Sequence, residues 1–233
     1  MALRPPRVNQ SRPYNIDGRR QRATETRQRV IETARVRFLR DGYAATTIAK
    51  VARGARVSPE TIYKTFGGKA GLVRAICQAA LAGDGSVHAE RRSDELSAGS
   101  AGARDVIRGW GRLIGEVAPR IAPLYLLLRD AAVTEADAEA LRAELEEARF
   151  RRMRRNATAL ARTGHLRRGL SVARTAEILW LHSAPEVYEL LVVRRTWTPR
   201  QLGAFVAASL TALLLDESVA PARQRPGKRR LKA

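Results

Sequence analysis

Residues 42–66 read GYAATTIAKVARGARVSPETIYKTF, and this stretch decides the fold of the N-terminal part of the chain. Its pattern predicts two short helices separated by a turn at residues 54–57. Thr46 or Thr47 can cap the first helix, and Ser58 can cap the second. The proline after Ser58 is favourable there, because the N–H of a first helical residue has no partner within the helix. The predicted buried sides carry Ile48, Val51, Ala52, Ile62 and Phe66.

The segments on both sides of this stretch predict longer helices. A helix from about Thr24 to Asp41 has its apolar residues on one face, and Gly42 follows it where a left-handed cap favours glycine. A further helix opens at Lys69 and carries another apolar stripe. Because two short helices are not stable alone, these neighbours must supply their core. One short helix then protrudes, with a polar side that fits the major groove and an N-terminus that favours phosphate.

The stretch from Arg29 to Leu72 resembles the N-terminal domain of the TetR family of bacterial regulators. The residues that carry the resemblance are Ile31, Ala34, Phe38, Gly42, Tyr43, Thr46, Thr47, Ile48, Val51, Ala52, Val57, Ser58, Thr61, Ile62, Tyr63, Phe66, Lys69 and Leu72. The resemblance implies DNA-backbone contacts for Thr47 and Tyr63 and a phosphate contact for Lys69. The candidates for reading bases or facing the groove are Ser58, Pro59, Glu60, Thr61 and Lys64.

Each of these residues also has a purely structural interpretation. Thr47 and Ser58 can serve only as helix caps, and Tyr63 can pack against its neighbours. Glu60 can balance the helix dipole, since a carboxylate in the groove must find a cytosine amino group. Lys69 can be an ordinary surface lysine.

One position departs from the family pattern. The family usually has glycine before the valine of the turn, whereas this chain has Arg56 there and Gly54 two residues earlier. An arginine is strained if the position needs a positive φ. Either the turn is shifted or Arg56 itself contacts phosphate, so Arg56 joins the DNA-binding candidates.

The whole chain of 233 residues has a net charge of +20. The excess of positive charge lies mainly outside the middle of the chain. Lys and Arg outnumber Asp and Glu by six to one in residues 1–23, eleven to four in 24–83, twenty to seventeen in 84–216 and six to one in 217–233. This excess suggests a polyanionic partner, although a GC-rich genome also favours arginine. We expect a disordered basic arm over 1–23, a helix-turn-helix DNA-binding domain over 24–83 and a disordered basic tail over 217–233.

The rest of the chain also predicts helices, which makes the fold class all-α. Residues 83–103 are rich in Gly, Ser and charge and predict a linker or a frayed helix end. A regulatory and dimerisation domain over 104–216 is expected to contain helices at about 104–118, 119–131, 135–163, 172–194 and 199–215. The Arg151–Arg155 cluster in the third of these is interpreted as a solvated face.

The segment from Ala176 to Leu215 resembles a common C-terminal domain of TetR-like regulators. The matching residues are Leu179, Trp180, Ser183, Pro185, Glu186, Val187, Tyr188, Leu190, Leu191, Val192, Trp197, Leu213, Leu214 and Leu215. The resemblance implies that the last two helices pair with their copies in a homodimer; a purely intramolecular core is the alternative. The apolar stripe wide enough for more than one neighbour contains Leu202, Phe205, Val206, Leu210, Leu213 and Leu214.

The same resemblance implies a pocket for a small-molecule effector in the C-terminal domain. Pro185 lies inside a predicted helical run, where it should kink the helix and can open a cavity. The candidate lining residues, each of which can instead be ordinary core, are Trp110, Ile114, Tyr125, Phe150, Trp180, His182 and Tyr188.

The sequence does not predict catalysis. The three histidines, His88, His165 and His182, are scattered without metal-ligand spacing, and Cys77 favours a buried thiol. Glu186 and His182 are four residues apart, which we interpret as a surface or pocket-edge pair. We therefore expect no metal, no cofactor and no enzymatic activity. No apolar run reaches about 18 residues, so we expect no membrane span and no membrane partner.

Together these features predict a cytoplasmic transcriptional regulator that associates with the nucleoid when bound to DNA. We expect a repressor that binds a palindromic double-stranded DNA operator as a homodimer and is released by an unknown small-molecule effector. Two alternatives stay open. A non-specific basic nucleic-acid or nucleoid-binding protein would show little preference between DNA sequences, and an enzyme would use the C-terminal helical domain for turnover.

Overall fold

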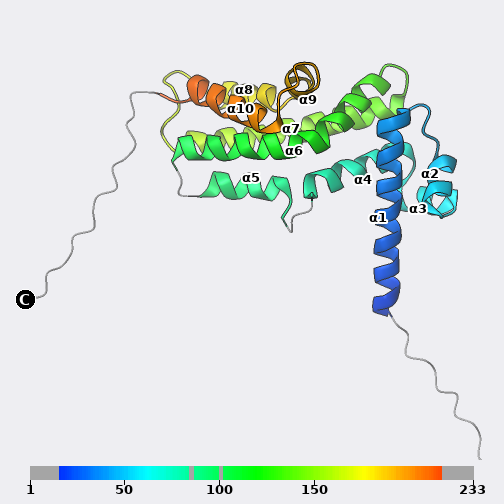
Figure 1. The fold of residues 1–233 in the computed structure, drawn as a ribbon. Coiled ribbons are helices and arrows are strands. Elements are labelled where there is room, and N and C mark those ends of the chain that lie inside the picture. Colours follow the sequence, from blue (N-terminus) through cyan, green and yellow to red (C-terminus); the bar gives the residue numbers. More distant parts are fainter. Residues whose placement is uncertain (1–15, 84–86, 100–101, 217–233) are drawn as a thin grey trace, which may run out of the picture.

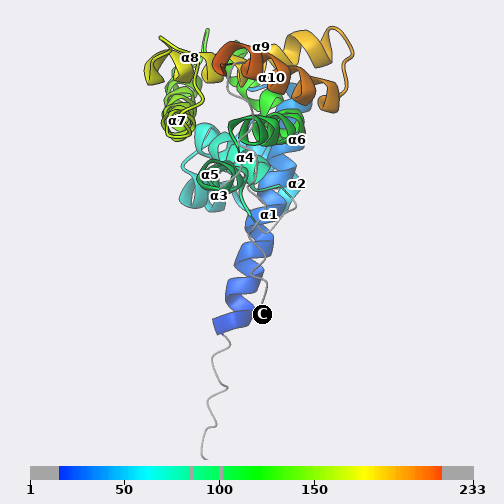
Figure 2. The same ribbon diagram turned by 90° about the vertical axis from the view of Figure 1, so that its left-hand side faces the viewer.

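The computed structural model describes residues 16–83, 87–99 and 102–216, and within them the chain is all-α. Apart from one isolated bridge between Leu166 and Leu215, these residues contain no β-structure. In both Figure 1 and Figure 2, helix α1 projects away from a layered body that includes α6, α7, α8 and α10. The elements are α1 (Ile16–Asp41), α2 (Ile48–Ala55), α3 (Pro59–Phe66), α4 (Lys69–Ala82), α5 (Ala89–Ala98), α6 (Ala103–Ala131), α7 (Ala136–Ala161), α8 (Val172–His182), α9 (Pro185–Tyr188), the π-helix η1 (Glu189–Val193) and α10 (Pro199–Leu214).

Helices α1 to α4 surround the first hydrophobic core. Phe38 from α1 and Ile62 from α3 are fully buried there, and Tyr43 stacks on Phe38. The Tyr43 hydroxyl donates a hydrogen bond to Asp137 on α7 at 2.7 Å. Gly42 ends α1 with φ 81°, in the left-handed conformation that the sequence predicts for this cap. The two short helices are thus held by longer ones on either side, as expected.

Helix α6 belongs to two hydrophobic cores. Toward its C-terminal end, Leu124 and Leu128 complete the first core together with Leu141 of α7. Toward its N-terminal end, Ile107 and Trp110 belong to a second core that also includes residues of α7, α8 and α10. One continuous helix therefore connects the core of the N-terminal helices to the core of the C-terminal helices.

The continuity of α6 corrects the expected boundary between residues 118 and 119. Pro119 and Pro123 lie inside the helix, where each removes a backbone donor and costs about 3 kcal/mol relative to alanine in an isolated helix. The buried side chains at both ends of α6 gain enough from packing to offset this cost, because each end lies in a separate core. Local propensity alone predicts the wrong boundary here.

Two expected irregular segments contain helix. Helix α1 begins at Ile16, within the expected disordered arm of residues 1–23; residues 1–15 and the tail 217–233 lie outside the described residues. Helix α5 occupies much of the expected linker at residues 83–103, and its Ala89 and Ser93 are buried. A helix that is polar overall can still form when a few small side chains pack against larger neighbours.

The expected long helix at 172–194 is divided into three parts. Helix α8 ends at His182, Pro185 opens α9, and η1 continues from Glu189. Pro185 therefore starts a helix and does not kink one, because a first helical position is where the missing N–H is harmless. Among the described residues, no helix is long and apolar enough to cross a membrane.

Candidate DNA-binding surface and effector cavity

The helix-turn-helix unit is fixed by two side-chain caps. Thr47 accepts a hydrogen bond from the Lys50 N–H at 3.2 Å and caps α2. Ser58 accepts one from the Thr61 N–H at 3.3 Å and caps α3. The capping roles of Thr47 and Ser58 are thereby confirmed, and their predicted DNA contacts are compatible with these roles because both residues remain exposed.

Helix α3 presents a polar side to solvent while Ile62 anchors its other side. Ile62 has no exposed surface, whereas the next residue, Tyr63, is 57% exposed. A packing role for Tyr63 is therefore wrong. The other exposed residues of this surface are Pro59, Glu60, Thr61 and Lys64 on α3 and the flanking Thr47, Arg56 and Ser58. Eight of the nine predicted DNA-binding residues are thus exposed, seven of them on α3 or in the turn before it and Thr47 at the start of α2.

Glu60 lies in the first turn of α3. Its pKa is lowered, first by the hydrogen bond with the Ser58 side chain and then by a backbone N–H at the helix start. The carboxylate is ionised and partly satisfied within the helix N-terminus. This supports the interpretation that Glu60 balances the helix dipole. The residue remains exposed and can still face a base in the DNA groove.

Arg56 occupies the left-handed conformation, with φ 55° and ψ 48°. The turn is therefore not shifted: the arginine stands at the position where the family has glycine. Its backbone N–H closes the end of α2 by donating to Arg53 at 3.3 Å. Its side chain is exposed and makes no hydrogen bond or ion pair with another described residue. Arg56 thus combines a strained backbone with an exposed guanidinium that pairs with no described residue.

Lys69 differs from the other candidates because its side chain is mostly covered. Its ammonium group lies 4.3 Å from the centroid of the Tyr43 ring and 4.0 Å from a carboxylate oxygen of Glu135. Lys69 is therefore more than an ordinary surface lysine. The same contacts compete with a phosphate for its charge.

A cavity of about 600 Å³ lies among α4 to α10, and no residue of α2 or α3 lines it. Five of the seven sequence-predicted lining residues border it: Trp110, Ile114, Tyr125, His182 and Tyr188. Burial raises the pKa of the Tyr125 hydroxyl far above its usual range, so this hydroxyl stays neutral. The size is within the range of cavities that enclose drug-sized molecules.

Phe150 and Trp180 do not border the cavity, so these two expectations were wrong. The two rings contact each other edge to face with centroids 6.2 Å apart, and Arg149 lies over the Trp180 ring at 4.9 Å. Phe150 is partly buried against the second core, whereas Trp180 is 37% exposed. Aromatic character did not reveal which face each residue occupies.

The cavity wall also contains polar residues that sequence reasoning missed. Arg149 and Arg152 are three residues apart on α7, and their side chains are only 12% and 13% exposed. Asn156 follows on the same side and donates to the Ser93 hydroxyl at 3.1 Å. The interpretation of Arg152 as part of a solvated cluster was wrong. The signal lay in the spacing 149–152–156, which marks one helix face whatever the residue types are.

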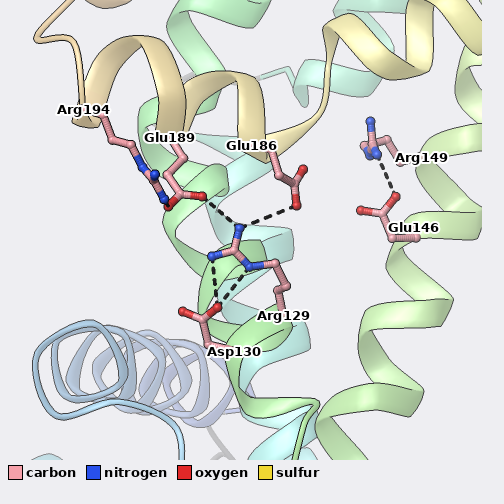
Figure 3. A network of polar contacts seen from close by, with 7 residues as sticks. All are labelled: Arg129, Asp130, Glu146, Arg149, Glu186, Glu189 and Arg194. Carbon is pink, nitrogen blue, oxygen red and sulfur yellow. Dashed lines mark hydrogen bonds and ion pairs between the residues drawn. The ribbon is translucent and has the colours of Figure 1, made fainter.

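A network of ion pairs connects α6 to α9 and η1 (Figure 3). Arg129 of α6 contacts Glu189 of η1 at 2.8 Å and Glu186 of α9 at 3.9 Å. Arg129 and then Arg194 lower the pKa of the Glu189 carboxyl through hydrogen bonds. Glu186 thus pairs with Arg129 and not with His182, whose Nδ1 lies 2.8 Å from the Ile178 carbonyl.

Exposed apolar side chains gather on α8 to α10. The stripe expected on the last helix divides in two: Leu202, Val206, Leu210 and Leu214 are buried within the chain, whereas Phe205 and Leu213 are about 40% exposed. Leu181 on α8 is also exposed, and α8 and α10 are in contact. The intramolecular core therefore uses only the inner edge of the stripe and leaves the outer edge uncovered.

No group of three or more His, Cys, Asp or Glu residues within the described ranges is arranged to hold a metal ion. Cys77 is buried as expected, and burial raises the pKa of its thiol to about 12, which keeps it protonated and unreactive at neutral pH.

Comparison with known proteins finds a family match for the N-terminal helices. The model of the bacterial regulatory proteins of the tetR family matches residues 30–76, which run from α1 into α4. No curated protein sequence matches the chain significantly.

Three solved structures illustrate the likeness in fold. The SmeT–triclosan complex is 16% identical, with a TM-score of 0.66 over 85% of this chain and 96% of that one. NalD of Pseudomonas aeruginosa, described as the secondary repressor of the MexAB-OprM multidrug efflux pump, is 16% identical with a TM-score of 0.63 over 84% and 99%. A transcriptional regulator from Saccharomonospora viridis in complex with choline is 16% identical with a TM-score of 0.61 over 83% and 99%.

The likeness extends over both helical parts, and the family model covers the surface built around α3. The residues that the family model matches include the cap residues Thr47 and Ser58 and the buried Ile62 of α3. Residues 30–76 therefore match the tetR family of bacterial regulatory proteins, and the chain shares its fold with solved transcriptional regulators.

Proposed function

We propose that the protein is a repressor that binds a palindromic DNA operator as a homodimer and releases it when a small molecule occupies the cavity. The observation that carries the proposal is α3, a capped helix with its apolar side buried and its polar side free. A helix of this kind fits the major groove, where its N-terminal residues lie nearest the base edges. We further propose that the protein acts in the bacterial cytoplasm.

The exposed residues divide into two groups by their expected role. Thr47 and Arg56 at the two ends of α2 and Tyr63 on α3 are proposed to contact the DNA backbone. Lys69 is proposed as a phosphate contact that must first leave Glu135. Pro59, Thr61 and Lys64 on α3 are proposed to face the bases, together with Ser58 and Glu60. Backbone contacts fix the register, and contacts to base edges give specificity.

Dimerisation is proposed through the uncovered apolar surface of α8 and α10. Phe205 and Leu213 lie on the outer edge of α10, and Leu181 lies on the neighbouring α8. Pairing of these helices with their copies around a two-fold axis would bury the patch and place two copies of α3 on one duplex. Half-sites about one helical turn apart then follow.

The cavity and the DNA-binding surface share structural elements, which supports coupling between them. Helix α4 lines the cavity through Cys77, Gln78 and Leu81, and its N-terminus follows α3 after only two residues. Helix α6 lines the cavity and completes the first core. A molecule that binds better to one arrangement of α4 and α6 shifts the population toward that arrangement and changes the spacing of the two α3 helices.

Selection of bound sequences from random double-stranded DNA tests the proposal. We expect recovery of a palindrome that binds roughly a thousandfold or more tightly than random DNA at the same salt concentration. Equal binding to all sequences would instead identify the non-specific basic nucleic-acid binder that the charge distribution also allows.

A pair of matched variants shows whether α3 does the reading. Lys64→Ala and Arg154→Ala each remove one exposed positive charge, but only the first lies on α3. We expect Lys64→Ala to weaken operator binding or relax its sequence preference, and Arg154→Ala to leave both unchanged. Equal effects of the two variants would contradict the assignment of α3.

A further inference from the structure

Three residues that border the cavity each have a buried hydrogen-bond donor without an acceptor. The indole Nε1 of Trp110 and the Nε atoms of Arg149 and Arg152 are buried and have no hydrogen-bond partner among the described residues. All three residues border the cavity, and Trp110 is only 4% exposed. Because buried donors without a partner destabilise the protein, such groups indicate an acceptor that binds there.

The charges around the cavity are already balanced. The Arg149 guanidinium lies 2.6 Å from Glu146, and that of Arg152 lies 2.7 Å from Asp94 and 3.5 Å from Glu90. Arg74, the third arginine of the wall, pairs with Glu144. Glu90 and Glu144 also border the cavity. An anion would therefore lose its hydration without gaining an unpaired cation.

The remainder of the wall is largely apolar. It includes Ile114, Val117, Met153 and Leu179 and the rings of Tyr125 and Tyr188. This surface favours an apolar molecular body, and the donors require that the body carry an acceptor.

We propose that the ligand of this cavity is an electrically neutral, largely apolar molecule with at least one oxygen acceptor, such as a ketone, an ester or an amide. The acceptor oxygen takes hydrogen bonds from Trp110 Nε1–H and from the Nε–H of Arg149 or Arg152. The inference rests on the proposed effector role of the cavity and specifies the chemical class that it takes.

Three probes of the same size test the inference by calorimetric titration of the full chain without DNA. 2-Acetylnaphthalene supplies a neutral carbonyl, 2-isopropenylnaphthalene replaces that oxygen by a methylene group, and 2-naphthoate supplies an anion. We expect the ketone to bind about two- to tenfold more tightly than the hydrocarbon, which is the range of one net hydrogen bond, and more tightly than the naphthoate.

The variant Trp110→Phe removes one donor and keeps an aromatic ring. We expect it to reduce the preference for the ketone over the hydrocarbon, because only the ketone uses the Nε1–H. Trp197→Phe is the control: the same change is made at a tryptophan that does not line the cavity. If Trp110→Phe does not fold, the comparison of the three probes on the unchanged protein still decides the matter.

The inference is overturned if the hydrocarbon or the naphthoate binds as well as the ketone, or if none of the three binds. An unchanged preference in folded Trp110→Phe would also overturn it, since water alone would then satisfy the indole. These outcomes differ from a failure of the proposed function. A protein that binds the ketone as expected but selects no DNA sequence is not a repressor, although the assignment of the cavity stands.

Discussion

The replacement Arg56→Gly separates two contributions of one residue. The backbone of Arg56 is left-handed, which costs a non-glycine residue about 1–2 kcal/mol. Glycine avoids this cost but loses about 0.5–1 kcal/mol through the greater freedom of its unfolded chain. The difference is a gain of at most about 1.5 kcal/mol, and about 0.75 kcal/mol from the midpoints of the two ranges. The side chain has no partner among the described residues whose loss would reduce this gain. We expect the melting temperature to rise by about 1–4 °C.

The same variant should bind DNA less tightly if the exposed guanidinium contacts phosphate. The slope of log K against log salt concentration is then expected to become shallower by about 0.9 for each protomer of the bound dimer. Arg56→Ala is the matched control, because it removes the same charge and keeps a left-handed non-glycine residue. Thermal unfolding at one fixed protein concentration and DNA titration at several salt concentrations measure the two effects.

Each half of this reasoning can be refuted separately. If Arg56→Gly is no more stable than Arg56→Ala, the left-handed backbone is not strained. If both variants keep the salt slope of the unchanged protein, Arg56 does not contact phosphate.

Three other changes have defined outcomes. Gly203→Val places a Cβ 2.5 Å from the Gly111 carbonyl oxygen where α10 crosses α6, and it should lower the free energy of unfolding by about 1–3 kcal/mol in urea titrations; an unchanged midpoint would argue against this close crossing. Phe205→Glu puts a charge into the proposed dimer surface and should yield the 25.7 kDa protomer in sedimentation experiments, whereas a surviving dimer would show that α10 does not form the interface. Cys77 keeps its proton up to about pH 12 in the folded chain but loses it near pH 9 when unfolded, so its contribution to stability is complete below pH 9 and is lost as the pH rises toward 12. The unfolding free energy of Cys77→Ala should therefore fall less steeply above pH 9 than that of the unchanged protein, and parallel slopes would exclude this contribution.

The sequence predicted the DNA-binding unit well because its signals are local. Thr47 and Ser58 cap helices through N–H groups three residues away, and Ile62 is placed inward by the helical step alone. The left-handed position of Arg56 could be suspected only by comparison with the glycine usual in the family. Only the structure gives the backbone angles of Arg56.

The cavity was predicted less completely because it depends on packing between distant helices. Tyr125 and Trp110 were expected to line it since large rings favour enclosed sites, but the same argument wrongly included Phe150 and Trp180. Arg152 was interpreted as solvated because the basic residues follow acidic ones along this helix, an order that complements the helix dipole. Its burial depends on Glu90 and Asp94 of α5, a helix that the polar composition of residues 83–103 concealed.

The double membership of α6 limits how the protein can be divided. A fragment ending near residue 83 would keep α1 to α4 but lose Leu124, Leu128 and Leu141, which fill the side of their core that α4 faces. Such a fragment would expose Leu72 and Ile76 to water and be prone to aggregate. For the same reason, a chimera that joins α1 to α4 to another ligand-binding domain must also include the C-terminal part of α6. Otherwise the packing interface between the two parts must be redesigned.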